Sequence, residues 1–296
     1  MMSALLLAFA PVVALAQSDV IRDDEVLDGD RPEAWAMHYM TASTLMTSFG
    51  PTPALAPGQW EVAVELGEVP HLNAEQRVVG FNGIKNEDLN KSPVFGRVRG
   101  FIGLPWGFVG ELAWTPPIEI DGAKPRDLWA AALARRVYDK DGIAISLRAF
   151  GQHGAVVGDV TCPAHLAGVE DFVLNPYGCE APSSDTLALN YYGLESTAAL
   201  QHGPWTWHLT GGVVRMENEV QVDALTFGFR DYSRLTATDD VGYVAFGVGR
   251  TLPHGWGLAA EVLYVPLTVV RPATDSPDND PLLSFRLQVR YAFDAR

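Results

Sequence analysis

The sequence has few basic residues, few cysteines and no long apolar run in its body, and each shortage excludes a class of protein. Its 21 Lys and Arg residues stand against 36 Asp and Glu residues, so the net charge is −15 at pH 7. This charge argues against nucleic acid as a partner. After the first 16 residues, no segment approaches the length of about 18 consecutive apolar residues that indicates a membrane-spanning helix. Helical membrane spans are therefore excluded.

Cysteine is limited to Cys162 and Cys179. Together with the nearby His165 they are too few ligands for a structural zinc site, so we predict no metal and no other cofactor. In an exported chain two cysteines are expected to pair. We therefore predict a disulfide between them, within a loop 153–185 on the extracellular side, that stabilises the fold by about 3 kcal/mol.

The histidines are scattered, which bears on catalysis. They form no His-x-Ser-Asn run, and no Asp-x-Asp pair lies opposite one of them at a strand end. The side-chain groupings with which a membrane hydrolase would activate a nucleophile or move a proton are thus missing. We predict that the protein is not an enzyme, and we name no catalytic residue. The seven histidines are His38, His71, His153, His165, His202, His208 and His254.

The first 16 residues carry no charge and contain an apolar run from Leu5 to Ala14. Ala14-Leu15-Ala16 before Gln17 matches a small-x-small cleavage site, which predicts a secretory signal peptide over residues 1–16 even though a basic start is missing. The run is shorter than the roughly 20 residues of a membrane span. The mature chain is therefore expected to be exported.

Large apolar residues occupy every second position from Leu283 to Phe293. A period of two predicts a β-strand with one apolar face and one polar face. In a soluble β-sandwich the apolar face would form the core. In a transmembrane β-barrel the apolar face contacts lipid and the polar face lines the lumen. Export of the chain makes the barrel the preferred interpretation.

A turn that combines Pro, Gly and Trp recurs along the chain, each time directly before an alternating strand. Tryptophan at several strand ends predicts the aromatic girdle of a membrane barrel, because the indole has an apolar body and a polar N–H group. A further strand follows Asp141-Gly142, a hairpin-type turn. The predicted girdle residues are Trp60, Trp106, Trp205 and Trp256.

The predicted connections alternate strictly between tight turns and long loops. This asymmetry is typical of bacterial barrels, which have short periplasmic turns and longer external loops. We predict an all-β fold with one antiparallel transmembrane barrel of ten strands over 57–296, or twelve if Gln76–Phe81 and Val222–Arg230 are strands. Segment 17–56, with a helix within 32–49, is expected at the periplasmic rim or in the lumen. The longer loops are 67–93, 115–127, 153–185, 216–240 and 266–281.

Alternation along the strands sends charged side chains into the lumen. Glu and Arg residues then share one interior and are expected to pair, since each isolated buried charge costs several kcal/mol. Ten strands enclose little more space than the eight whose side chains fill a barrel, so a filled lumen and a conducting channel are both open. The predicted lumen-lining residues are Glu61, Glu65, Arg97, Arg99, Glu111, Arg136, Arg148, Glu195, His208, Glu261, Arg286 and Arg290.

These features together resemble the bacterial outer-membrane β-barrel proteins as a class. The final strand is similar to the aromatic-terminated signal that the barrel-assembly machinery reads, with Tyr291 and Phe293 as its last apolar positions. It departs from that signal at Gln288, where glycine is common, and in the residues that follow Phe293. The distinctive segment from Pro105 to Glu119 has no activity assigned to it.

The resemblance implies a place in the Gram-negative outer membrane. Partners would then be outer-membrane lipid, lipopolysaccharide and the barrel-assembly machinery. The function predicted first is passive transport of small solutes, including hydrophobic ones, through a narrow lumen gated by the long loops or by 32–49. The alternative is a non-conducting barrel with a structural or adhesive role.

Overall fold

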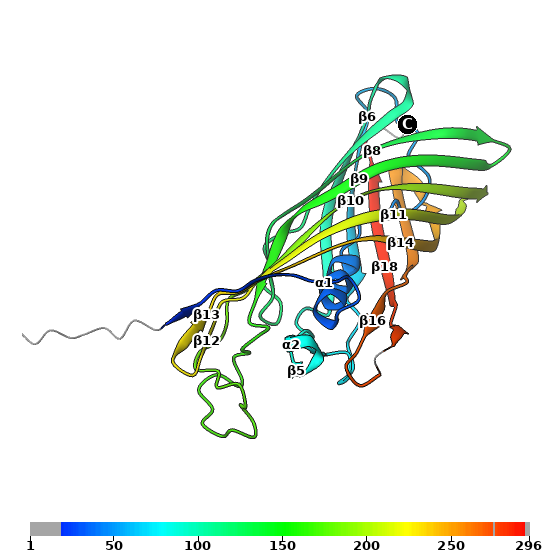
Figure 1. Ribbon diagram of the computed structural model, residues 1–296. Coiled ribbons are helices and arrows are strands. Elements are labelled where there is room, and N and C mark those ends of the chain that lie inside the picture. Colours follow the sequence, from blue (N-terminus) through cyan, green and yellow to red (C-terminus); the bar gives the residue numbers. More distant parts are fainter. Residues whose placement is uncertain (1–18, 275, 294–296) are drawn as a thin grey trace, which may run out of the picture.

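The computed structural model describes residues 19–274 and 276–293. Within these residues, ten long strands form one antiparallel sheet (Figure 1). The sheet closes on itself because β18 pairs with β3 and β11 pairs with β14. In order around the ring the strands are β3 (Trp60–Glu68), β6 (Val94–Gly103), β7 (Phe108–Trp114), β8 (Lys124–Lys140), β9 (Ile143–Gly158), β10 (Asp185–His202), β11 (Trp205–Gln221), β14 (Arg234–Thr251), β15 (Trp256–Val265) and β18 (Leu282–Ala292).

The closed ten-stranded barrel confirms the predicted fold. The two stretches that would have raised the strand number lie outside the ring. The first holds the short strand β4 (Val78–Val79) and the helical turn α2 (Gly80–Gly83), and β4 pairs with β5 (Lys85–Asn86). The second holds β12 (Ala224–Thr226) and β13 (Phe229–Asp231), which pair with each other. The twelve-strand alternative and the soluble sandwich are therefore wrong.

The strands alternate as the sequence predicts, with the apolar residues outside. On β18, Leu283, Phe285 and Leu287 are 46–59% exposed, whereas Ser284, Arg286 and Gln288 between them are at most 4% exposed. A soluble protein would bury the first set and expose the second. The reversed pattern is that of a barrel that has lipid outside and a polar interior.

Tight turns lie at one end of the barrel and long loops at the other. Two of the tight turns are the 3₁₀ turns η1 (Pro105–Gly107) and η2 (Pro253–Gly255). In each, a residue with positive φ, Trp106 or His254, precedes a glycine that also has positive φ, a backbone conformation that glycine adopts without steric cost. The loops at the other end carry β12, β13 and the small pair β16 (Thr268–Val270) and β17 (Pro277–Asn279).

The predicted disulfide is present between Cys162 and Cys179. It lies in the loop that joins β9 to β10, at the long-loop end. Cys179 also forms a β-bridge to Thr226 of β12, so the disulfide loop is attached to the neighbouring loop. The predicted signal peptide lies outside the described residues.

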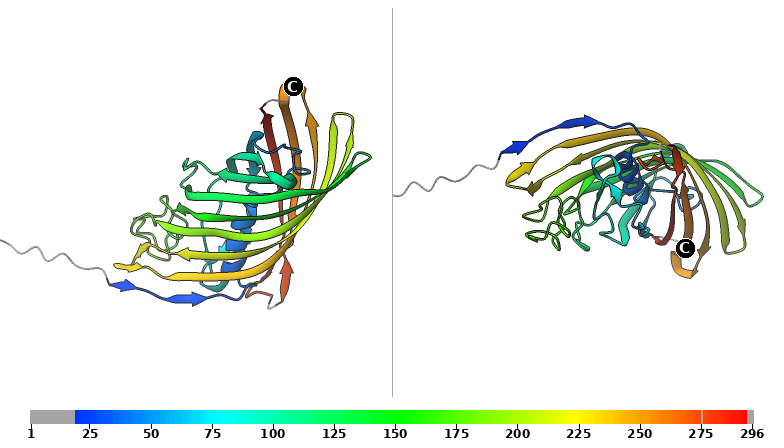
Figure 2. Two further views of the ribbon diagram at one scale, coloured as in Figure 1. Left: turned by 90° about the horizontal axis from the view of Figure 1, so that it is seen from above. Right: turned by 60° about the horizontal axis from the view of Figure 1, so that its bottom comes forward.

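The segment before the barrel enters the ring from the long-loop end. Its first strands, β1 (Val20–Ile21) and β2 (Asp24–Val26), run parallel to β13 and to the start of β14. Helix α1 (Pro32–Ser43) then lies inside the ring (Figure 2). Residues 19–26 therefore lie at the end opposite to the expected periplasmic rim.

Helix α1 starts and ends for identifiable reasons. Pro32 stands in its first turn, where a missing N–H costs nothing, and Glu33 favours the positive end of the helix dipole. Its surface is buried on nearly every side by the barrel wall, which is why its sequence lacks a clear polar face. Within the part of the chain that the structure describes, no helix is long and apolar enough to cross a membrane.

Candidate functional site: a filled lumen below an apolar cavity

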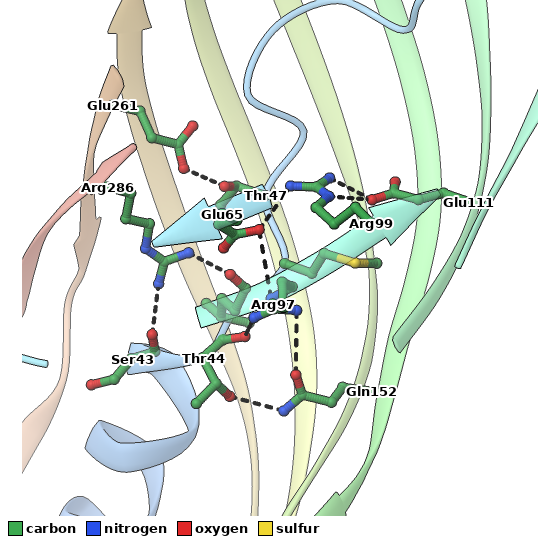
Figure 3. A network of polar contacts seen from close by, with 12 residues as sticks. Ser43, Thr44, Thr47, Glu65, Arg97, Arg99, Glu111, Gln152, Glu261 and Arg286 are labelled. Carbon is green, nitrogen blue, oxygen red and sulfur yellow. Dashed lines mark hydrogen bonds and ion pairs between the residues drawn. The ribbon is translucent and has the colours of Figure 1, made fainter. Parts of the chain in front are cut away.

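The middle of the barrel contains a network of buried charges. Carboxylates and guanidinium groups come from strands on opposite sides of the ring and meet at the centre (Figure 3). Each of them is at most 8% exposed, so bulk water does not screen them. The carboxylates are Glu65, Glu111, Glu195 and Glu261, and the guanidinium groups are Arg97, Arg99, Arg148 and Arg286.

The network is a continuous chain of ion pairs across the lumen. Arg99 donates from Nε to Glu111 at 2.6 Å and from Nη1 to Glu65 at 3.0 Å. Arg148 donates to the other oxygen of Glu111 at 2.9 Å and to Glu195 at 3.0 Å. Glu111 is thus shared by both arginines, and each arginine also binds a second carboxylate. Breaking one member would leave its partners buried and uncompensated, which costs about 3–5 kcal/mol.

Three of these arginines also bind backbone carbonyls at the C-terminal end of α1 and in the three residues after it. Arg286 donates to the carbonyl oxygens of Ala42 and Ser43, both at 3.1 Å, and to that of Leu45. Arg148 donates to the Met46 carbonyl at 2.7 Å, and Arg97 donates to the Thr44 carbonyl. The last carbonyls of a helix have no partner within the helix and carry its negative dipole end. Cationic donors from the barrel wall satisfy both needs.

The chain after α1 continues down the lumen toward the tight-turn end. Thr47 donates to Glu261, and the amide of Thr52 donates to Ser146 at 2.9 Å. The Thr52 carbonyl accepts two bonds from Arg136, at 2.6 and 3.1 Å. Residues 44–56 therefore lie in the lower lumen, and Thr47 and Thr52 are bonded to its wall.

The structure places every predicted lumen-lining residue on the inward face of its strand or near its lower end. Arg136 faces inward, and the neighbouring Arg135 faces outward. Nε2 of His208 lies 3.5 Å from Glu261, in the wall of the network. The residues that are only half-buried, near the tight turns, are Glu61, Arg136 and Arg290.

Aromatic side chains ring the tight-turn end of the barrel. The predicted girdle residues Trp60, Trp106, Trp205 and Trp256 are 42–84% exposed. Trp60 stacks on Phe293 with ring centroids 3.7 Å apart, and Trp256 lies 4.9 Å from Tyr291. The two residues of the predicted assembly signal thus pack against two girdle residues where the ring closes.

A closed barrel with apolar side chains outside, ion pairs inside and aromatic residues at its rim is the architecture of a membrane-spanning β-barrel. The fold is that of a bacterial outer-membrane β-barrel. Such a barrel spans the outer membrane of Gram-negative bacteria, with its short turns in the periplasm and its long loops outside.

Comparison with known proteins adds little to this assignment. No protein-family model and no curated protein matches the chain. Similar solved structures include the outer membrane protease OmpT of Escherichia coli (TM-score 0.36, 9% identity, 80% of this chain and 94% of that one). They also include Ail, the attachment invasion locus protein of Yersinia pestis (0.27, 10%, 80% and 99%), and a mutant of the monoaromatic hydrocarbon channel TodX (0.28, 8%, 81% and 68%). Likenesses this distant carry no argument about activity.

Above the charged network lies a cavity of about 610 Å³. Its floor combines Arg97 and Glu65 of the network with the end of α1. Most of the wall is apolar. This site could not be found from the sequence, because its members come from helix α1, from most of the barrel strands and from several loops, and they share no local motif. Apolar residues that line it include Met37, Met40, Phe95, Val156, Leu187 and Leu189.

Charged residues gather at the outer rim of the cavity. Lys85 donates to Glu87 at 2.6 Å and to the carbonyl of Thr161 at 2.6 Å, which ties loop 67–93 to the disulfide loop. Burial raises the pKa of Glu87 to about 7, and the neighbouring lysine offsets only part of that effect. Among residues 19–274 and 276–293, no group of three side chains could hold a metal ion.

Proposed function

We propose that this barrel takes up small apolar solutes from outside the cell and does not conduct ions. The observation that carries the proposal is the apolar cavity, which opens at the long-loop end and stops at the charged network. Its volume of about 610 Å³ is within the usual range for small-molecule sites. An apolar molecule would gain about 25 cal/mol for each Å² that it removes from water there.

The lower lumen is a poor route for such a molecule and for ions alike. A solute that continued downward would have to separate Arg99 and Arg148 from Glu111, and each exposed charge costs several kcal/mol. It would also have to displace residues 44–56, which are bonded to the wall at Thr52. This supports a change from the first expectation, in which the solute crosses the whole lumen.

Entry of the apolar dye phenylnaphthylamine into intact cells tests the proposal, since the dye fluoresces only after it reaches an apolar phase. Cells that produce the protein should take up the dye faster than cells that lack it. Met40→Trp should return the rate to that of cells lacking the protein, because Met40 lines the cavity and is half-buried. Leu287→Trp is the matched control, because Leu287 is exposed on the lipid side, outside the cavity.

Heat-modifiable migration on a gel shows that each variant is assembled. Dye entry at the same rate with and without the protein would contradict the proposal and favour the structural or adhesive alternative. A planar bilayer with the inserted protein should be electrically silent. Discrete conductance would instead favour a channel through the lumen.

A further inference from the structure

The barrel wall has a gap at the upper end of β6. On one side this strand is paired with β3 along its length, from Ile102 with Trp60 to Val94 with Glu68. On the other side its pairing with β7 stops at Val98, opposite Trp114. Residues 94–97 of β6 therefore have no neighbouring strand on that side among the described residues.

The gap has a cause in the sequence. β7 ends at Trp114, and Pro116-Pro117 follow, within the distinctive segment from Pro105 to Glu119. Proline has no N–H group to donate to a ladder, so two of them in succession stop the strand. The chain leaves the wall over residues 116–123 and returns as β8, whose upper end pairs only with β9, as far as Lys124 with Val157.

The gap lies at the depth of the lipid. Gly96 pairs with Leu66 of β3, and Leu66 pairs with Leu287 of β18, so the three residues form one row across the wall. All three face outward, and Leu66 and Leu287 are 55% and 46% exposed. These are the apolar residues that contact hydrocarbon in the barrel. An opening in this row opens into the membrane and not into the medium.

An unpaired strand edge at this depth requires an explanation. Gly103 forms backbone hydrogen bonds with residues 58 and 59, on the β3 side of the strand. Along an antiparallel strand the backbone N–H and C=O groups of successive residues point alternately to one neighbour and to the other. Val94 and Gly96, at odd separations from Gly103, therefore point these groups away from β3 and into the gap. In hydrocarbon each unsatisfied group costs several kcal/mol, and such backbone is tolerated only where it lines a cavity. The hydroxyl of Ser92 donates to the Val94 carbonyl at 2.6 Å, which satisfies one of them.

The cavity extends through this gap. Its lining includes Phe95 and Arg97, which face the interior, and also Val94 and Val98, which face the lipid. On the far side of the gap it is lined by Pro116, Ile118 and Pro125. One continuous space therefore touches both faces of the wall and both edges of the opening.

We propose that the opening between β6 and β8 is a lateral exit through which an apolar solute passes from the cavity into the hydrocarbon layer of the outer membrane. The inference rests on the proposed function and specifies its route. The solute never crosses the charged network, which explains how a transporter can have a filled lumen. Gly96 lines the cavity at this edge of β6 and faces outward, and a side chain there would first meet the flexible end of the Leu66 side chain.

The lateral exit can be blocked after the barrel has assembled, so a loss of dye entry cannot be caused by a folding defect. Both native cysteines are in the disulfide, so Gly96→Cys would introduce a single free thiol at the exit. Benzyl methanethiosulfonate converts this thiol to a benzyl mixed disulfide with loss of methanesulfinate, and a mild reductant removes the benzyl group. Gly100→Cys is the matched control, on the same strand and face but opposite Leu112 of β7, where the wall is closed.

We expect the benzyl group at position 96 to abolish protein-dependent phenylnaphthylamine entry into cells and the reductant to restore it, with no effect at position 100. Unchanged entry with a fully labelled Gly96→Cys variant would overturn the lateral exit. If Met40→Trp still blocks entry in that case, the proposed uptake stands and the solute leaves elsewhere. If Met40→Trp has no effect either, the proposed function fails as well.

Discussion

Replacing Arg286 by Met should loosen the helix that fills the lumen. Arg286 is 1% exposed and donates to the carbonyl groups of Ala42 and Ser43 at the C-terminal end of α1 and to that of Leu45 just after the helix. Methionine fills much of the same volume but donates nothing. Two helix carbonyls and one just after the helix would lose a charged donor, and a hydrogen bond to a charged group contributes about 1.5–3 kcal/mol.

The summed loss is about 4–9 kcal/mol before compensation. Part of it is offset because the guanidinium no longer has to be kept out of water, and because the freed carbonyls can relax toward other donors. A net cost of about 3 kcal/mol is a reasonable expectation, and it raises the population of the displaced helix about a hundredfold. The barrel strands themselves do not depend on this residue for their pairing.

Two measurements check this reasoning. The purified variant should unfold at lower guanidinium concentration in lipid micelles, and in a planar bilayer it should show brief current steps that the natural protein lacks. Arg290→Met is the control, because Arg290 is on the same strand, is half-buried and makes no ion pair within the described residues. An unchanged unfolding midpoint together with a silent bilayer would refute the claim that Arg286 holds the helix.

Two further predictions concern the extracellular side. Burial raises the pKa of Glu87 from its usual value near 4.5 to about 7, so the folded loop binds a proton more tightly than the unfolded loop, and its stability falls as the pH rises from about 4.5 through 7. Protection factors of the amides in 67–93, in which the intrinsic exchange rate at each pH is divided out, should therefore be lower at pH 8 than at pH 5. Glu87→Gln should remove this difference, and an equal pH dependence of the protection factors in both proteins would show that another group is responsible. An epitope tag placed before Asp19 should be accessible to antibody on intact cells, because β1 pairs with the loop strand β13; detection only after the outer membrane is permeabilised would mean that this end lies in the periplasm.

Features set by neighbouring residues were predictable from the sequence. Alternation in a strand such as Leu283–Phe293 depends on nothing but the two-residue period of the backbone, so the lipid face and the lumen face could be assigned strand by strand. The tight turns and their tryptophans are equally local. The disulfide followed from there being only two cysteines in an exported chain. The outer-membrane barrel fold follows from such local patterns, whereas the choice between ten and twelve strands was made only by the structure.

Features that depend on register and on distant contacts could not be predicted. The sequence shows that Arg99 and Glu111 face inward, but only the tertiary structure decides that Arg99 also meets Glu65 and that Arg286 meets a helix more than 240 residues away in sequence. In the same way, Pro116-Pro117 predicts the end of a strand. Whether an opening remains in the wall depends on how far β6 and β8 extend beyond that end on either side. Ion pairs and gaps in a barrel wall depend on which strands are adjacent and on their register, and both are determined only when the chain folds.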